Sequence, residues 1–111
     1  MQQVVHLSDV KQLKDLIVNN SNKLVVLDFY ADWCGPCKLA GQLFDNEILP
    51  THKNVVLVKI DVDKPELESL STEYSVRGIP RLIFYNKLKI VEDMTGFKKD
   101  AIKAVCKTYG L

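Results

Sequence analysis

The sequence contains few of the residues that hold small proteins together through disulfides or metals. Its 111 residues include only three cysteines and two histidines. A disulfide framework usually has a larger and even number of cysteines, so a disulfide-stapled fold is not expected. A structural zinc site needs four ligands, and His6 and His52 lie far apart and not at ligand spacing. We therefore expect neither a metal nor another cofactor.

The sequence also lacks a charge imbalance and a long apolar segment. Its formal net charge is +1, whereas nucleic acids and anionic membranes are usually bound by strongly basic surfaces. No apolar run approaches the ~20 residues of a membrane span. The N-terminus, "MQQVVHLSDVKQLKDL", lacks the basic and then apolar segments of a secretory signal. We expect a cytoplasmic protein, or an organellar one that has lost a transit peptide, with no nucleic-acid or membrane partner.

What the sequence does contain is the hydrophobic pattern of one α/β domain, expected to span residues 1–111. Five β-prone segments alternate with four segments of helical periodicity. The strands are predicted at residues 4–7, 24–30, 54–62, 81–85 and 89–95, and the helices after Ser8, after the CGPC motif, after Asp63 and from about Lys99. Ser8 and Asp63 are predicted to cap their helices. The order βαβαβαββα predicts a mixed sheet, parallel at its centre, with helices on both faces.

The stretch "ADWCGPCKLA" places two cysteines at the junction between the predicted central strand and the following helix. A dithiol at this spacing can bind a metal, form a structural disulfide or exchange electrons. Cys34 falls at the helix N-terminus, where free N–H groups and the helix dipole favour the reactive thiolate. Cys37 lies one helical turn along, close enough to attack a mixed disulfide on Cys34. Pro36 fixes φ in the first turn and Gly35 leaves the approach uncrowded, so the pattern favours exchange.

An aspartate interrupts the apolar run that leads to the dithiol. Asp28 lies in the segment "LVVLDFY", where burying an ionised carboxylate is costly, so its pKa should be raised. It is placed to act as the base that deprotonates Cys37. The alternative is an aspartate on a strand face that is open to water. Lys59, in the neighbouring strand, is a candidate distant partner of Asp28 or a surface charge.

The chain resembles the thioredoxin family from end to end, and four segments carry the resemblance. They are "VVLDFYADWCGPCK" at the dithiol, "VKIDVDKPEL" at the third strand and following helix, "YSVRGIPRLIFY", and the late glycine of "TGF". A CxxC motif beside a βαβ pattern is itself typical of this family. The resemblance implies a thioredoxin fold, in which Cys34 is the attacking nucleophile, Cys37 the resolving thiol and Asp28 the buried acid–base group.

The same resemblance implies a substrate-binding surface around the dithiol. Trp33 resembles the family's surface tryptophan, with a core tryptophan as the alternative. Pro80 resembles the family's cis-proline, which base rates alone would not predict because about 5–6% of X–Pro bonds are cis. Ile79, just before it, would offer its backbone to an extended substrate segment.

The chain departs from the family pattern at several positions. Gln42 replaces a proline that usually kinks the second helix, so that helix should be straighter or bent weakly at Gly41. Arg81 replaces a threonine after the cis-proline and is either a solvated side chain or a positive charge on the rim of the site. In the turn "NKLK", Leu88 should not adopt positive φ, so this turn should differ from the family's Asn-Gly turn. Tyr30 replaces a common tryptophan. Cys106, on the last helix, is expected to be a buried or half-buried structural thiol.

The predicted function is thiol–disulfide oxidoreduction. The Cys34–Cys37 pair would reduce protein disulfides and be recharged by a thioredoxin reductase, with the chain acting as a monomer. The Gly-Pro pair favours reduction, because more oxidising members of this group of folds have a histidine before the second cysteine. The alternative is a thioredoxin-like binding module or chaperone subunit in which the dithiol is incidental.

Overall fold

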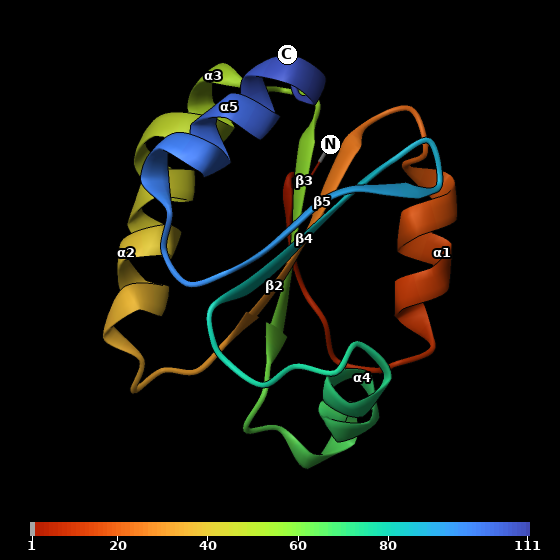
Figure 1. Cartoon of the computed structure of the whole chain (residues 1–111). Helices are drawn as coiled ribbons and strands as arrows, with labels where there is room; N and C mark the ends of the chain where they lie inside the picture. Colours follow the sequence, from red (N-terminus) through yellow and green to blue (C-terminus); the bar gives the residue numbers. More distant parts are fainter. Residues whose placement is uncertain (1) are drawn as a thin grey trace.

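The chain folds as a five-stranded mixed sheet covered by helices on both faces (Figure 1). The computed structural model describes residues 2–111. The strands are β1 (Val4–His6), β2 (Leu24–Tyr30), β3 (Val55–Asp61), β4 (Arg81–Asn86) and β5 (Lys89–Thr95). The helices are α1 (Gln12–Asn19), α2 (Gly35–Leu43) with its continuation through η1 (Phe44–Ile48) and α3 (Leu49–Thr51), η2 (Pro65–Leu67) with α4 (Glu68–Glu73), and α5 (Lys99–Tyr109). This order confirms the predicted fold class.

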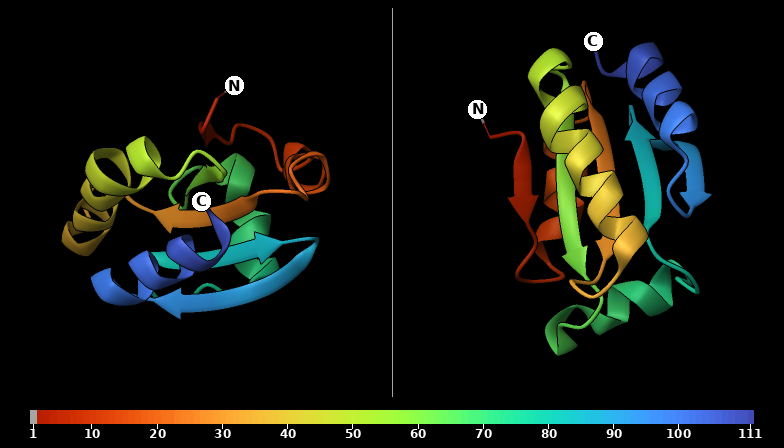
Figure 2. Two further views of the ribbon diagram at one scale, coloured as in Figure 1. Left: turned by 90° about the horizontal axis from the view of Figure 1, so that it is seen from above. Right: turned by 90° about the vertical axis from the view of Figure 1, so that its left-hand side faces the viewer.

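The sheet order β1-β3-β2-β4-β5 places β2 at the centre. Strands β1, β3 and β2 run parallel, and β4 and β5 are antiparallel to their neighbours. Because side chains alternate along a strand, β2 supplies two cores. Leu24 and Val26 pack beneath α2 and α5, while Val25 and Leu27 pack on the side of α1 and α4. Figure 2 shows α2 and α5 lying side by side over one face. The carboxyl end of β2 therefore emerges between two packed layers.

The first helix begins later than predicted, and the prediction of Ser8 as its cap is wrong. Val10 and Lys11 form a turn before the helix, and the Asp9 carboxylate accepts a hydrogen bond from the Lys11 N–H at 2.9 Å. The Gln12 side-chain oxygen accepts bonds from the Ser8 and Asp9 N–H groups at 3.1 and 3.2 Å. Side chains of Asp9 and Gln12 thus satisfy the free donors here, as a cap would.

The second helix changes its hydrogen-bonding pattern after Leu43. It changes to a π-helical turn at Phe44–Ile48 and continues as α3 to Thr51. Wide turns of this kind interrupt α-helices in place of a proline kink. Phe44 and Ile48, at the two ends of the wide turn, are both buried in the core beneath α5. The helix therefore follows the sheet without the proline that Gln42 replaces.

The β4–β5 connection contradicts the expectation for Leu88. Lys87 and Leu88 both have positive φ, 52° and 68°. Asn86 pairs directly with Lys89, and a two-residue connection of this kind matches strand twist only with positive φ at both positions. The turn is also tied to the neighbouring loop, because the Lys87 N–H donates to the Ser21 carbonyl at 3.0 Å. Pairing and these contacts outweigh the local preference of leucine.

Replacing Leu88 with glycine should stabilise the protein. The left-handed region costs a non-glycine residue about 1–2 kcal/mol, and the greater unfolded-state freedom of glycine offsets part of this gain. We expect the free energy of unfolding in urea to rise by roughly 0.5–1 kcal/mol. Leu88→Ala is the matched control, because it removes the exposed side chain but keeps Cβ. Equal stability changes in the two variants would show that positive φ is not the cause.

Candidate active site

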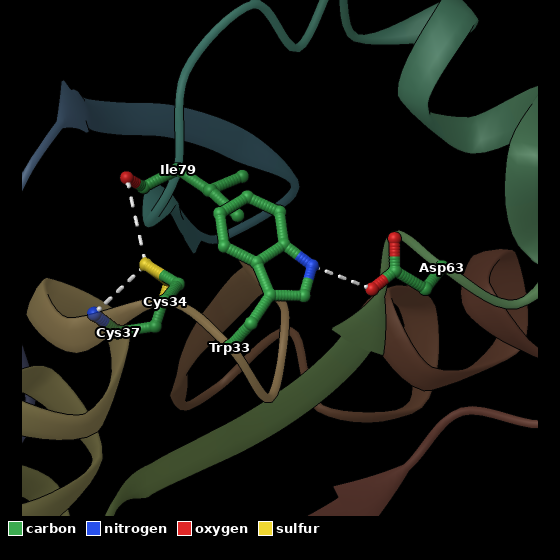
Figure 3. Close-up of a disulfide and its surroundings, with 5 residues drawn as sticks. All are labelled: Trp33, Cys34, Cys37, Asp63 and Ile79. Atoms are coloured by element: carbon green, nitrogen blue, oxygen red, sulfur yellow. Dashed lines mark hydrogen bonds between the residues drawn. A yellow bond between two sulfur atoms is a disulfide. The ribbon is translucent and has the colours of Figure 1, made fainter.

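The two cysteines lie at the N-terminus of α2, directly after the carboxyl end of β2. Cys34 is the N-cap residue, and its Sγ accepts a hydrogen bond from the Cys37 N–H at 3.1 Å (Figure 3). The two residues form a disulfide with a Cα–Cα distance of 5.2 Å. Pro36 lies in the first helical turn, as predicted. The helix therefore directs at the sulfur of Cys34 its positive end and an N–H group of its first turn, where N–H groups have no partner within the helix.

The two cysteines are largely buried, and no metal-binding cluster surrounds them among residues 2–111. Cys34 and Cys37 are each 5% exposed in the disulfide form and pack against Ala31, with Tyr30 and Ile79 at the edge. Exposure in the disulfide form therefore does not distinguish the two cysteines, whereas the N–H group directed at Cys34 Sγ does. Within residues 2–111, no group of three or more His, Cys, Asp or Glu side chains is placed to hold a metal ion.

The segment before β4 faces the disulfide. The Ile79 carbonyl oxygen lies 3.9 Å from Cys34 Sγ (Figure 3), and the Ile79–Pro80 peptide bond is cis, which confirms that prediction. Pro80 is buried, and its carbonyl accepts a hydrogen bond from the Gly96 N–H at 2.8 Å. Gly96 has a φ of 93°, which a residue with a side chain rarely adopts. Pro80 and Gly96 thus join the segment to the end of β5.

Trp33 is 70% exposed beside the disulfide, so the alternative of a core tryptophan is wrong. Its Nε1–H donates to Asp63 Oδ2 at 2.9 Å (Figure 3). Asp63 was predicted to cap the following helix, but Lys64 is the N-cap residue there and no side-chain cap is formed. The Asp63 carboxylate instead fixes the exposed indole. Asp63 is the site residue that the sequence analysis missed, because an acid before a Pro-initiated helix resembles a cap.

Asp28 is buried in the middle of the sheet, which excludes the water-facing alternative. It is 1% exposed, and neither carboxylate oxygen has a hydrogen-bond partner among the described residues. Burial raises its pKa from 3.8 to about 6, while Lys59, opposite it on β3, lowers it in part. Lys59 Nζ lies 4.4 Å from the centroid of the Tyr30 ring. The Asp28 carboxyl therefore releases its proton at a pH closer to neutrality than an ordinary aspartate does.

A cleft of about 330 Å³ connects this region with solvent. It lies between the end of β2 and the first turns of α2. Its lining residues are Tyr30, Ala31, Asp32, Cys37, Lys38, Gly41, Gln42, Asp45 and Lys59. Because Cys37 is among these residues, the cleft gives water a path to it.

Comparison with known proteins assigns the family. A family model described as Thioredoxin matches residues 4–108. The chain belongs to the thioredoxin family. Thioredoxin of Mycoplasmoides gallisepticum is 39% identical over 103 residues, which cover 92% of this chain and 98% of the relative. Thioredoxin-1 of Caenorhabditis elegans is 38% identical over 96 residues, covering 86% and 78%.

Solved thioredoxin structures have the same architecture. Reduced thioredoxin of Schistosoma mansoni superposes with a TM-score of 0.84 at 31% identity, covering 97% of this chain and 99% of that one. Fasciola hepatica thioredoxin gives 0.83 at 28% identity, covering 95% and 98%. With its Cys34–Cys37 pair, the chain is a thiol–disulfide oxidoreductase, and its family implies protein disulfides as substrates and recycling by a reductase. In the described part of the chain, no helix is long and apolar enough to cross a membrane.

Arg81, which replaces the threonine of the thioredoxin pattern, is neither the solvated side chain nor the rim charge that were predicted. It is not solvated, because its side chain is 16% exposed. It is not a rim charge either, because its guanidinium forms a bidentate ion pair with Asp93 on β5. The ion pair directs the guanidinium towards β5.

Cys106 is fully buried on α5 and is not in a disulfide, as expected for a structural thiol. Burial raises its pKa to about 12. Burial therefore disfavours its thiolate, which is the reactive form of a cysteine.

Proposed function

We propose that this thioredoxin reduces protein disulfides with Cys34 as the attacking group. The Cys34 thiolate attacks one sulfur of the substrate disulfide, forms a mixed disulfide and releases the first substrate thiolate. The Cys37 thiolate then attacks the Cys34 sulfur and releases the second, leaving an oxidised pair and two substrate thiols. The observation that carries this assignment is the hydrogen bond from the Cys37 N–H to Cys34 Sγ at the helix N-terminus. A thioredoxin reductase would return two electrons to the pair.

Asp28 would serve as the base in the second step. Its raised pKa places it near the working pH, where a general base is most effective. Gly35 and Pro36 would support the first step. A Cβ at Gly35 would meet no atom within 4 Å, so the space beside it is free for an approaching substrate. Pro36 would hold the helical turn that positions both sulfurs.

Substrate would bind across Trp33, Ile79 and Pro80. The Ile79 backbone faces Cys34 Sγ, so an extended segment that pairs with it would bring its disulfide to the nucleophile. The exposed indole of Trp33, held by Asp63, offers apolar contact beside the sulfur.

The chain is further proposed to act as a cytoplasmic monomer without a nucleic-acid partner. Its net charge of +1 supports the absence of a polyanion partner. The edges of the sheet favour a monomer, because β1 has three residues and β5 carries exposed charged side chains, including Glu92 and Asp93.

Alkylation of the reduced protein tests the assignment of the nucleophile. We expect iodoacetamide at pH 7 to modify Cys34 at least about tenfold faster than Cys37, because helix N–H groups stabilise its thiolate. Cys106 should react only after unfolding, because it is buried and protonated. Mass spectrometry of peptides from timed samples gives the three rates. Equal labelling of all three thiols in the folded protein would contradict the assignment.

A further inference from the structure

The guanidinium of Arg81 connects three segments of the chain. Nε and Nη2 donate to the two carboxylate oxygens of Asp93 at 2.5 and 2.8 Å. Nη1 donates to the carbonyls of Tyr74 and Ser75 at 3.2 and 3.3 Å. All three guanidinium nitrogens are therefore used, in the fork geometry that only arginine provides. The side chain joins β4 to β5 and to the C-terminal end of α4.

The segment held in this way is the α4–β4 loop, residues 74–80. It begins at the two carbonyls bound by Arg81 and ends at Pro80, which is bonded covalently to Arg81. Ser75 has a φ of 52°, a conformation that costs a non-glycine residue free energy and persists only when its surroundings hold it. Arg81 thus fixes both ends of the loop that presents Ile79 to the dithiol.

The loop also lies tightly against β5, next to the ion pair. A Cβ at Gly78 would come within 2.9 Å of Thr95 Cγ2, and Thr95 is the residue opposite Arg81 in the ladder. The Pro80 carbonyl accepts from the Gly96 N–H, one residue further on. The position of the loop relative to β5 therefore depends on close contacts that lie next to the Arg81–Asp93 ion pair.

The ion pair with Asp93 indicates that Arg81 affects the reaction through geometry and not through its charge. Because the Asp93 carboxylate neutralises Arg81 at hydrogen-bond distance, little net charge remains to act on the dithiol or on an approaching substrate. Arg81 also makes no contact with the sulfurs. Its influence on the reaction must pass through the shape of the loop.

We propose that Arg81 and Asp93 are positioning residues that pre-organise the α4–β4 loop for protein substrates, an inference that rests on substrate pairing with Ile79. A loop already held in its bound shape loses less freedom on binding, so affinity is higher. This gain in affinity is expected only for extended protein substrates, which pair with the loop. A small disulfide needs only the sulfurs and would not sense it.

The test compares steady-state reduction of insulin with that of the small disulfide DTNB. Arg81→Thr removes the fork, Arg81→Lys keeps the charge without it, and Asp93→Asn weakens it from the other strand. Glu47→Gln is the matched control, because it breaks exposed ion pairs to Lys99 and Lys103 on the helices of the opposite layer. We expect KM for insulin to rise about fivefold or more in the first three variants, with kcat and the DTNB rate within about twofold of wild type.

Amide hydrogen exchange gives a readout that does not depend on the proposed function. The Val76 N–H, in the loop, donates to the carbonyl of Ser71 in α4 at 2.8 Å. Its exchange should accelerate at least about tenfold in Arg81→Thr and stay unchanged in Glu47→Gln.

The outcomes separate the alternatives. Unchanged Val76 exchange together with unchanged insulin KM would overturn the proposal, as would wild-type behaviour of Arg81→Lys, which would assign the effect to charge. Equal losses with insulin and DTNB would assign it to general stability and also overturn it. If Arg81→Thr does not fold, Asp93→Asn carries the same expectations. Failure of the wild-type protein to reduce insulin would instead contradict the proposed function, while Val76 exchange would still decide the role of Arg81.

Discussion

Replacing Cys34 with serine is expected to abolish insulin reduction, with turnover falling more than about 1,000-fold. The hydroxyl keeps the shape of the N-cap but is not ionised at neutral pH, so no group remains to attack a disulfide. The assay supplies a thioredoxin reductase with its electron donor and follows the release of insulin thiols. Cys106→Ala is the matched control, because that thiol is buried and protonated, and its turnover should stay within about twofold.

The complementary variant, Cys37→Ser, should capture the intermediate. With the second thiol removed, the mixed disulfide between Cys34 and substrate cannot resolve and should accumulate as a covalent complex visible on non-reducing gels. Full turnover by Cys34→Ser would support the alternative of a binding module with an incidental dithiol. Covalent complexes in Cys34→Ser rather than Cys37→Ser would reverse the assignment of the two sulfurs.

Replacing Asp28 with asparagine is expected to stabilise the protein in a pH-dependent way. Because the folded pKa of Asp28 lies at about 6, above its ordinary value of 3.8, the folded state holds a proton that the unfolded state releases between these values. Wild-type stability therefore falls as pH rises from 4 to 6 and stays lower above that range. At about 1.4 kcal/mol per pKa unit, the cost at pH 7 is roughly 3 kcal/mol.

Asp28→Asn removes this cost, so its gain should be near zero at pH 4 and roughly 2–3 kcal/mol at pH 7–8. Urea unfolding of both proteins at the two pH values measures the difference. A gain that is the same at pH 4 and pH 8 would contradict the buried, raised-pKa carboxylate.

The same variant should resolve mixed disulfides more slowly. Loss of a general base typically costs about 100-fold or more, and the deficit should be largest near pH 7. It should shrink towards pH 9, because the Cys37 thiol then ionises without help. Rapid-quench measurements of mixed-disulfide decay between pH 6 and 9 test this. Asp45→Asn is the control, because it removes the same charge from an exposed residue that lines the cleft beside Cys37. Wild-type rates in Asp28→Asn across this range would exclude the base.

The parts of the fold that follow from local pattern were predictable from the sequence. The uninterrupted apolar run of β2 indicated a central strand, and residues 24–30 are a strand that is buried almost throughout. The position of the dithiol followed, because a strand that ends before a Pro-initiated helix places the intervening cysteine at its N-terminus. Burial of Asp28 was likewise implied by its apolar neighbours.

The features that the sequence did not predict depend on partners far along the chain. Asp63 bonds to Trp33 across 30 positions, and Arg81 bonds to Asp93 on the neighbouring strand across 12 positions, so neither pairing has a local signal. Leu88 shows the opposite case, in which a clear local preference against positive φ is overridden by strand pairing. In each case tertiary contacts, rather than local preference, decided the conformation.

The equilibrium reduction potential of the Cys34–Cys37 pair tests the central claim most directly. The protein is equilibrated with glutathione or thioredoxin couples of known potential, and the oxidised fraction is measured after acid quenching. A reductant of protein disulfides should have a potential near that characteristic of thioredoxins, about −270 mV. A value above about −200 mV would place the pair among oxidising or isomerising dithiols and contradict the account.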